Sequence, residues 1–132
     1  MTQIFADTSF YAACLSPRDS YHHQAIALAA STQSTILTTE FVFVELANLF
    51  SKLARRQAAV RLIQQVRADA DTEIVPVTSD LLQRGFALYC NRPDKEWSLT
   101  DCISFVVMEE HGVREALTSD SDFEQAGFVK LL

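Results

Sequence analysis

The stretch LTDCISFVVMEEHGVREALTSDSDF, residues 99–123, decides the fold of this chain. It begins with the polar pair Thr100 and Asp101 ahead of a long apolar run, turns at Gly112 and ends on an acidic cluster. This order predicts a helix, a short strand over residues 116–118 and an acidic corner. One carboxylate then lies at a helix N-terminus. Others lie just past the carboxyl end of a strand, where open α/β sheets place their sites.

Outside this stretch, strands and helices alternate along the chain. We expect strands over residues 3–6, 34–38, 73–77 and 128–131, and helices over residues 10–15, 21–30, 40–53, 57–68 and 81–90. The expected N-caps of three of these helices are Ser20, Thr39 and Ser79. Such alternation implies parallel pairing through right-handed crossovers. The predicted fold is an α/β/α sandwich with a four- to five-stranded, mainly parallel sheet, formed by one domain over residues 1–132.

The composition excludes several classes of protein. The 132 residues are 48% hydrophobic, which predicts a globular chain rather than a disordered one. Only three glycines occur, so neither a phosphate-binding P-loop nor a dinucleotide-binding GxGxxG can be formed. The formal charge of -6 argues against a domain that binds nucleic acid through a large basic surface. A polyanionic substrate would therefore need metal ions or a local basic patch.

The cysteines and the N-terminal residues bear on the compartment. Cys14, Cys90 and Cys102 are odd in number, widely spaced and set in apolar surroundings, which favours free thiols in a cytoplasm over a disulfide framework. The first residues, MTQIFADTSF, lack the basic and then apolar pattern of a signal peptide. No apolar run approaches the length of about 18 residues that a membrane span requires. We expect a cytoplasmic protein without a membrane segment.

Four acidic residues stand at positions where carboxylates have chemical consequences. Asp7 and Asp120 follow predicted strands, so their side chains converge if those strands are neighbours. Glu45 lies in a predicted helix that is apolar on most sides, where an unpaired carboxylate costs several kcal/mol unless a cation or donors meet it. Asp101 begins a helix. Each has a plainer interpretation as a turn residue, a cap, a partner of the helix dipole or part of a narrow solvated stripe.

Taken together, these acids predict a metal site. Four carboxylates close to one another cannot all stay ionised without positive charge nearby. Oxygen ligands without His or Cys favour Mg²⁺ or Mn²⁺ over zinc. One or two such ions would lower the pKa of an attacking water and neutralise the leaving oxygen, which is phosphodiester hydrolysis. We expect catalysis and metal binding by Asp7, Glu45, Asp101 and Asp120, with Asp122 either starting a helix or supporting the site.

Four segments carry a resemblance to a known family. IFADTSFY, VELAN, SLTDCISF and ALTSDSDFEQAGF resemble, in order, the acidic motifs of PIN-domain proteins, particularly the VapC-like toxins of bacterial toxin–antitoxin pairs. The resemblance implies a PIN fold and a metal-dependent endoribonuclease that cleaves RNA with the four acids named above. Asp122 matches a position that varies in such proteins. The resemblance also implies a homodimer and a cognate antitoxin protein that blocks the acidic groove.

Several residues near the acids have open roles. The basic residues Lys52, Arg55, Arg56 and Arg61 either guide phosphate toward the acids, contact an antitoxin or form a solvated surface. Trp97 either stacks on a nucleobase or holds a loop in place. The hydroxyl side chains that flank the acids are candidates to hydrogen-bond them, and these are Thr8, Ser9, Thr100 and Ser119.

Two other functions stay open at this point. One is a phosphotransfer or phosphatase domain that uses a strand-end aspartate as a covalent nucleophile. Haloacid-dehalogenase-type phosphatases have a second aspartate two residues after the first, and here that position is Ser9. The other is a non-catalytic metal- or protein-binding module in which the acids bind metal structurally or cap helices.

Overall fold

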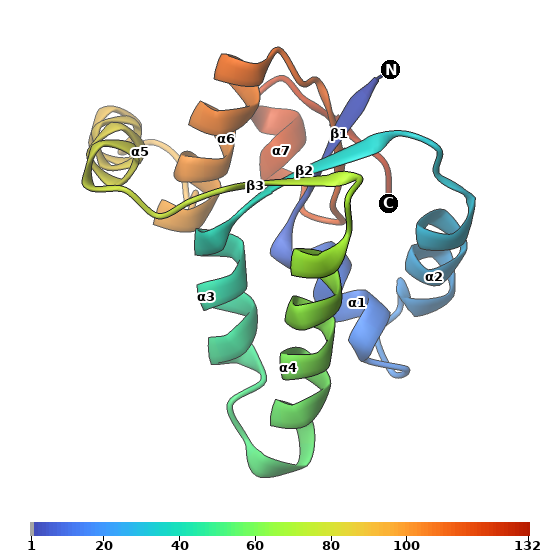
Figure 1. Ribbon diagram of the computed structural model, residues 1–132. Helices are drawn as coiled ribbons and strands as arrows, with labels where there is room; N and C mark the ends of the chain where they lie inside the picture. The colour runs from blue at the N-terminus through green and yellow to red at the C-terminus, as the bar shows by residue number, and fades with distance from the viewer. Residues whose placement is uncertain (1) are drawn as a thin grey trace.

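Five strands form one parallel sheet in the computed structural model, which describes residues 2–132 (Figure 1). The strands are β1 (Gln3–Ala6), β2 (Thr35–Thr39), β3 (Thr72–Val75), β4 (Glu115–Leu117) and β5 (Val129–Lys130). Their order is β3-β2-β1-β4-β5, and all four pairings are parallel. The predicted α/β/α fold with a mainly parallel sheet is confirmed.

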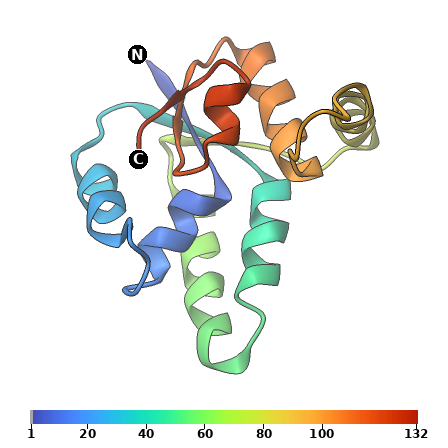
Figure 2. The same cartoon turned by 180° about the vertical axis from the view of Figure 1, so that it is seen from behind.

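Seven helices connect these strands within the described residues. They are α1 (Thr8–Leu15), α2 (His22–Ser31), α3 (Glu40–Leu49), α4 (Leu53–Ala68), α5 (Ser79–Asn91), α6 (Leu99–His111) and α7 (Asp122–Gln125). Figures 1 and 2 show α5, α6 and α7 gathered at one side of the sheet and α1 and α2 at the other. The antiparallel pair α3 and α4 extends away from the sheet, so the turn between them lies far from the strands.

The structure confirms the predicted N-cap of α3, but the predicted N-cap of α2 and the predicted boundary between the next two helices are wrong. Thr39 is the N-cap of α3, and its Oγ1 accepts a hydrogen bond from Val42 N at 3.2 Å. Ser20 is not a cap, since α2 follows Tyr21, whose N–H donates to the side chain of Asp19 instead. The predicted helix over residues 40–53 stops at α3, and α4 begins earlier than predicted, after a short turn. Local sequence signals do not locate such a turn, because it depends on how the two helices pack.

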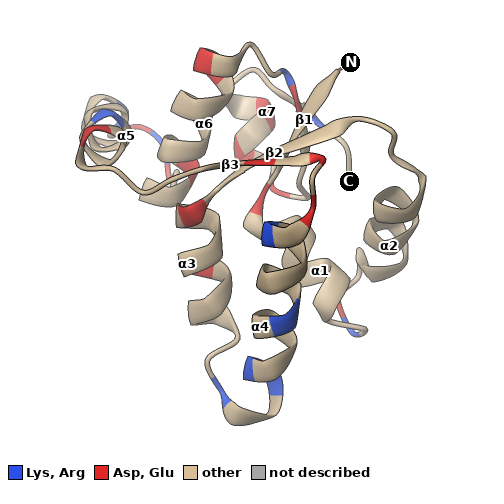
Figure 3. Cartoon of the chain, in the orientation of Figure 1, with Lys and Arg blue, Asp and Glu red and all other residues tan. Residues whose placement is uncertain are grey.

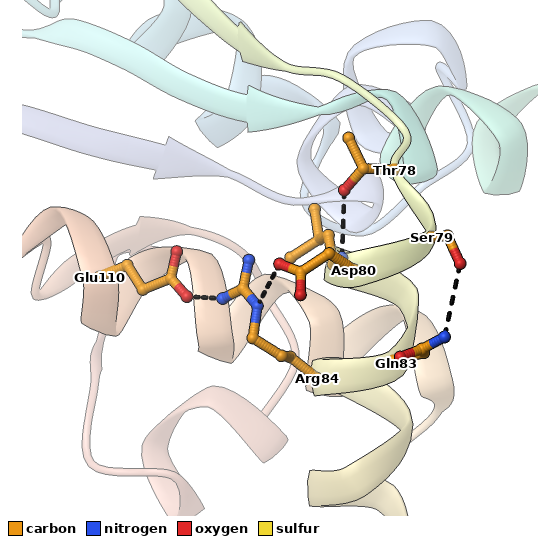
Figure 4. A network of polar contacts seen from close by, with 7 residues as sticks. Thr78, Ser79, Asp80, Gln83, Arg84 and Glu110 are labelled. Atoms are coloured by element: carbon orange, nitrogen blue, oxygen red, sulfur yellow. Dashed lines mark hydrogen bonds and ion pairs between the residues drawn. The ribbon is translucent and has the colours of Figure 1, made fainter.

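Helix α5 begins two residues earlier than predicted, at Ser79, and packs against α6. Its N-cap is Thr78 rather than Ser79, because Thr78 has an extended backbone and its Oγ1 accepts from Leu81 N at 3.1 Å. Figure 4 shows this cap and, beside it, Arg84, which contacts Asp80 of its own helix at 2.9 Å and Glu110 of α6. These exposed ion pairs contribute little free energy. The apolar contact between the two helices therefore holds α5 in place.

An aromatic cluster fills the core beside α6. The Phe105 ring packs edge-to-face against Trp97, with centroids 5.1 Å apart, and against Phe123, with centroids 4.9 Å apart. Trp97 is buried, and its Nε1 donates to Oε1 of Gln125 at 3.2 Å. Trp97 therefore anchors the segment that leads into α6, and the alternative of a nucleobase-stacking residue is wrong. This cluster fixes the N-terminus of α6, where Asp101 lies.

Two observations bear on the predicted compartment. Within residues 2–132, no helix combines the length and the apolar character needed to cross a lipid bilayer. The three cysteines are free thiols, with Cys102 buried and Cys14 partly buried. Cys90 is exposed on α5, so the prediction of apolar surroundings is wrong for that thiol.

A first prediction concerns the close approach of α5 and α6. A Cβ added at Gly85 would overlap Cγ1 of Ile103 and lie 3.1 Å from its Cα. Gly85→Ala should therefore lower the free energy of unfolding by about 1–3 kcal/mol through overpacking, although alanine in a helix interior is intrinsically favoured by about 1 kcal/mol. Urea denaturation measures this change.

The control is a double-mutant cycle with Ile103→Ala. Ile103→Ala removes Cγ1, the atom that the added methyl group overlaps, so the double variant should lose less stability than the sum of the two single variants. A Gly85→Ala protein that is more stable than wild type would contradict the close packing.

Candidate active site

The sheet brings the beginning and the end of the chain together. Strands β1 and β4 are neighbours, with Ala6 opposite Leu117, and the N–H of Asp7 donates to the carbonyl of Leu117 at 3.1 Å. Asp7 follows β1 directly, and Asp120 lies three residues after β4. The carboxyl ends of these strands meet at one edge of the sheet. The convergence that we expected for Asp7 and Asp120 follows from this pairing.

Asp7 is a buried carboxylate that hydroxyl groups hold in place. Its side chain is 3% exposed, and its Oδ2 accepts hydrogen bonds from Ser9 Oγ and Thr118 Oγ1, both at 2.9 Å. Burial raises the pKa of Asp7 to about 6, and the charge of Glu45 adds to this rise, whereas the two hydroxyl hydrogen bonds oppose it. Asp7 is also the N-cap of α1. The structure therefore confirms the cap interpretation, and the metal-site role of Asp7 stays a prediction.

The same two hydroxyls position the loop that carries Asp120. Ser9 Oγ accepts from the N–H of Ser119 at 3.2 Å, and Thr118 Oγ1 accepts from the N–H of Asp120 at 3.0 Å. Each hydroxyl thus receives a backbone hydrogen bond from this loop and donates one to Asp7. Sequence reasoning missed Thr118, although its place at the end of the strand that precedes Asp120 was a usable signal.

The other flanking hydroxyl at the start of α1 behaves differently. Thr8 Oγ1 is buried and has no hydrogen-bond partner within the described part of the chain. Its expected bond to an acid is therefore not formed. Buried polar atoms in folded proteins normally have a partner, and water or a bound ion serves where the protein supplies none.

Asp101 stands at the N-terminus of α6, 7% exposed. It forms a capping box with Ser98, in which Ser98 Oγ accepts from Asp101 N at 3.0 Å and Asp101 Oδ2 accepts from Ser98 N at 3.4 Å. Burial, the largest cause, and the charges of Asp7, Asp120 and Glu45 together raise the pKa of Asp101 to about 8. A helix cap alone does not have this property. The raised pKa shows that several carboxylates act on one another here.

Asp101, Asp120 and Asp122 form the tightest acidic group, with ligand oxygens that all lie within 4.8 Å of one another. Asp122 N donates to Asp120 Oδ1 at 2.9 Å, and this short turn points both side chains toward α6. Partial burial and the charge of Asp120 raise the pKa of Asp122. We expected Asp122 only as support, yet it lies in this group. Asp7 and Glu45 surround the group and act on Asp101 through their charges.

This donor set suits a hard divalent cation. All its ligand atoms are carboxylate oxygens, which Mg²⁺ and Mn²⁺ prefer, and no His or Cys belongs to the group. The raised pKa values of Asp7 and Asp101 mean that the negative charge is not balanced by the protein itself. A bound cation would supply that balance. The residues therefore fit a metal centre.

Comparison with known protein families shows to which family this chain belongs. A family model for the PIN domain matches residues 4–129. The chain belongs to the PIN-domain family. This finding confirms the resemblance that the four acidic segments indicated, and with it the PIN fold.

Individual relatives of this PIN domain narrow the comparison. The 23S rRNA-specific endonuclease VapC20 of Mycobacterium tuberculosis is 33% identical over 128 residues, which cover 97% of each chain. The crystal structure of VapC20, described as a toxin that cleaves the sarcin–ricin loop, superposes with a TM-score of 0.87 over 96% of each chain at 32% identity. The resemblance to VapC toxins is thereby confirmed.

Two further solved structures share the PIN fold at low sequence identity. FitAcB from Neisseria gonorrhoeae has a TM-score of 0.68 at 16% identity and covers 96% of this chain and 95% of its own. VapBC2 from Rickettsia felis, bound to a DNA fragment from its promoter, has a TM-score of 0.67 at 14% identity and covers 98% of this chain and 97% of its own. At these identities the likeness concerns the fold alone.

A second prediction follows from the raised pKa of Asp101. Between pH 3.8, the ordinary pKa of an aspartate, and about 8, the folded protein holds a proton that the unfolded chain has released. The folded state then binds more protons, so the stability of the metal-free protein should fall as pH rises through this window. Thermal unfolding in the presence of EDTA measures the trend, and Asp101→Asn should flatten it.

Added Mn²⁺ provides a second test of whether these carboxylates are protonated in the metal-free protein. It should raise the melting temperature more at the alkaline end of the window than at the acid end, because the cation binds ionised carboxylates. The exposed residue Asp71 lies outside the site, so Asp71→Asn should behave like wild type. A metal-free melting temperature that rises across the window would contradict the prediction.

Proposed function

We propose that this PIN-domain protein is a metal-dependent endoribonuclease and the toxin of a type II, VapBC-like toxin–antitoxin pair. The observation that carries the proposal is the convergence of buried carboxylates at one edge of the sheet, in a chain that is 33% identical to VapC20 over 97% of its length. VapC20 is a 23S rRNA-specific endonuclease. The sarcin–ricin loop, which VapC20 cleaves, is therefore the first substrate to test.

We assign metal binding to Asp101, Asp120 and Asp122, with Asp7 and Glu45 completing the catalytic set of acids. When bound, Mg²⁺ or Mn²⁺ would lower the pKa of water and neutralise the charge that develops on the phosphodiester oxygens. Asp7 receives the hydrogen bonds of Ser9 and Thr118 at Oδ2. Its Oδ1 accepts no side-chain hydrogen bond in the described part of the chain, so we assign that oxygen to the metal-assisted reaction.

The protein's own residues set the protonation state of the site. Burial and neighbouring acids favour the protonated form of Asp101 when positive charge is absent. A cation reverses this preference, because it favours the ionised carboxylate. The hydroxyls of Ser9 and Thr118 keep Asp7 oriented in either state. The site is therefore arranged to take up a cation and to release protons as it does so.

The proposed partners are RNA, a second copy of this chain and an antitoxin protein. FitAcB and VapBC2 share this fold. An apolar stripe on α5 supports a protein contact. Leu82, Phe86 and Tyr89 follow helical spacing and are 40%, 52% and 48% exposed. We assign this stripe to the homodimer, and we place the activity in the cytoplasm, where the proposed RNA substrate is found.

A third prediction tests the catalytic assignment. Asp101→Asn and Asp7→Asn should each reduce cleavage of a sarcin–ricin loop RNA by at least about a hundredfold, because each removes a charge that the metal-assisted reaction requires. Both variants should remain folded, since asparagine keeps the shape of the side chain. Gel analysis of RNA products with Mn²⁺ present gives the rates, and circular dichroism checks the fold.

Asp71→Asn is the matched control and should cleave at the wild-type rate. Metal-dependent cleavage that persists in either site variant would contradict the assignment. A wild-type protein that binds Mn²⁺ but cleaves no RNA would favour the non-catalytic binding module instead. A covalent acyl-phosphate on an aspartate would favour a phosphotransfer domain.

A fourth prediction concerns the dimer. Phe86 and Tyr89 present parallel rings with centroids 6.2 Å apart on the exposed face of α5. Phe86→Asp should convert a dimer into a monomer, because it places a charge in an apolar interface. Sedimentation velocity measures the mass. Val129→Asp alters another exposed apolar residue, on the edge strand β5, and should leave the dimer intact. A Phe86→Asp protein that stays dimeric would contradict the assignment of this stripe.

A further inference from the structure

A basic cluster at the far end of α3 and α4 has no role in the carboxylate site. It consists of Arg18 in the α1–α2 loop together with Lys52, Arg55, Arg56 and Arg61 at and beyond the start of α4. Figure 3 shows basic residues gathered around the turn between these two helices. The cluster holds five of the eleven Lys and Arg residues in a chain with a net charge of -6. Its charge is therefore opposite in sign to that of the whole molecule.

No carboxylate neutralises this cluster within the part of the chain that the structure describes. The arginines outside it form ion pairs with acids: Arg67 with Glu40, Arg84 with Asp80 and Glu110, Arg92 with Asp94 and Arg114 with Glu109. The five cluster residues form none. An unpaired positive patch on an acidic protein creates a strong local field that attracts anions.

Neutral acceptors hold two of the guanidinium groups in place. Arg55 Nη2 donates to Ser16 Oγ at 2.6 Å, and its guanidinium carbon lies 4.2 Å from the centroid of the Phe50 ring. Arg56 Nε donates to the carbonyl of Ser51 at 3.0 Å. Each guanidinium has five N–H donors, so most stay available. The side chains are oriented without losing their charge, which lowers the entropy cost of binding a phosphate.

The start of α4 is itself a site that favours anions. Lys52 is the N-cap, makes no side-chain capping bond, and is followed by a first turn without an acid. The N-terminus of a helix carries partial positive charge, so cations placed there reduce the stability of the helix. A sequence that breaks a local stability rule in this way commonly does so at a functional site. A bound anion would satisfy both the helix end and the basic side chains.

Two residues of the cluster line a cavity whose other lining residues are mostly apolar. A cavity of about 500 Å³ lies between the end of α1 and the start of α4, and Arg18 and Arg55 line it. The apolar lining comes from Leu15, Pro17, Phe50, Ala54 and Ala58. Arg61 follows Ala54 and Ala58 at helical spacing and lies on the same face of α4. Cations beside an apolar lining suit a nucleotide, which carries a phosphate and a largely apolar sugar and base.

The cluster lies within reach of a strand bound at the acids. Glu45 lies about 6 Å along the helix axis from Leu49, where α3 ends, and Lys52 follows three residues later across the turn to α4. Phosphates along one strand of a duplex are spaced by about 3.4 Å. A strand held at the carboxylates would therefore reach the cluster within a few nucleotides.

We propose that Arg18, Lys52, Arg55, Arg56 and Arg61 bind the phosphate backbone of the RNA substrate, a few nucleotides away from the bond that is cleaved. This inference rests on the proposed ribonuclease function. It explains how a protein with a net charge of -6 holds a polyanion: the acids receive the cleaved phosphate through a cation, and the basic cluster binds the neighbouring backbone directly.

The test measures RNA binding apart from cleavage. In an Asp101→Asn background, fluorescence anisotropy gives the affinity for a sarcin–ricin loop hairpin over a range of KCl concentrations. The triple variant Lys52→Ala/Arg55→Ala/Arg56→Ala should reduce the slope of log K against log salt by about 2, since each lost contact with single-stranded RNA removes about 0.7. At low salt it should bind at least tenfold more weakly than the parent protein.

The matched control is Arg84→Ala/Arg92→Ala/Arg114→Ala, which removes the same charge from residues that are already paired with acids. Its slope should stay close to that of the parent protein. If Arg55 proves necessary for folding, Lys52→Ala/Arg61→Ala replaces the triple variant, and its slope should fall by about 1.4. Both of those side chains are exposed.

The outcomes separate this inference from the proposed function. An unchanged slope in the cluster variant, or an equal fall in the control, overturns the RNA-binding role even if the wild-type protein cleaves RNA. A cluster variant that keeps RNA affinity but loses binding to polyglutamate shows an acidic protein partner instead, and also overturns it. A reduced slope in the cluster variant alone supports the inference, even if the wild-type protein fails to cleave.

Discussion

The structure depends on negative charge buried at the carboxyl edge of the sheet. Asp7 and Asp101 are 3% and 7% exposed, and no basic side chain forms an ion pair with either of them within the described residues. Desolvation of a carboxylate is costly, so a fold that keeps two such groups together needs compensation. Hydroxyl and backbone donors supply part of it, and a divalent cation fits the remainder. The folded state and the candidate activity are linked through this one constraint.

The hydrogen bonds that stabilise the buried carboxylates connect parts of the chain that are distant in sequence. Ser9 and Thr118 lie at opposite ends of the sequence, yet both donate to Asp7 and accept from the loop that carries Asp120. On the other side, the aromatic contacts of Phe105 with Trp97 and Phe123 set the position of α6 and of the helix that follows Asp120. The hydrogen bonds orient the carboxylates, and the apolar core holds their helices at the right distance.

Positive and negative charge are separated along the pair α3 and α4. Glu45 lies midway along α3 near the other acids, and the unpaired basic cluster lies at the far end of the pair. Acids alone would repel a nucleic acid, and basic residues alone would bind it without cleaving it. Their separation along one structural unit suits a polyanion that is held at one place and cut at another.

The sequence alone determined the parallel α/β/α fold, the order of its elements, the family and the acids that form the candidate site, because hydrophobic periodicity and short motifs are local properties of the chain. It did not determine the N-caps of α2 and α5, the turn between α3 and α4 or the role of Trp97, since each depends on contacts with distant residues. The tertiary structure alone decided that Asp122 joins Asp101 and Asp120, that Thr118 supports Asp7 and that Glu45 acts through its charge. Distances between carboxylates follow from the packing of strands and helices, and no single segment of sequence contains that information.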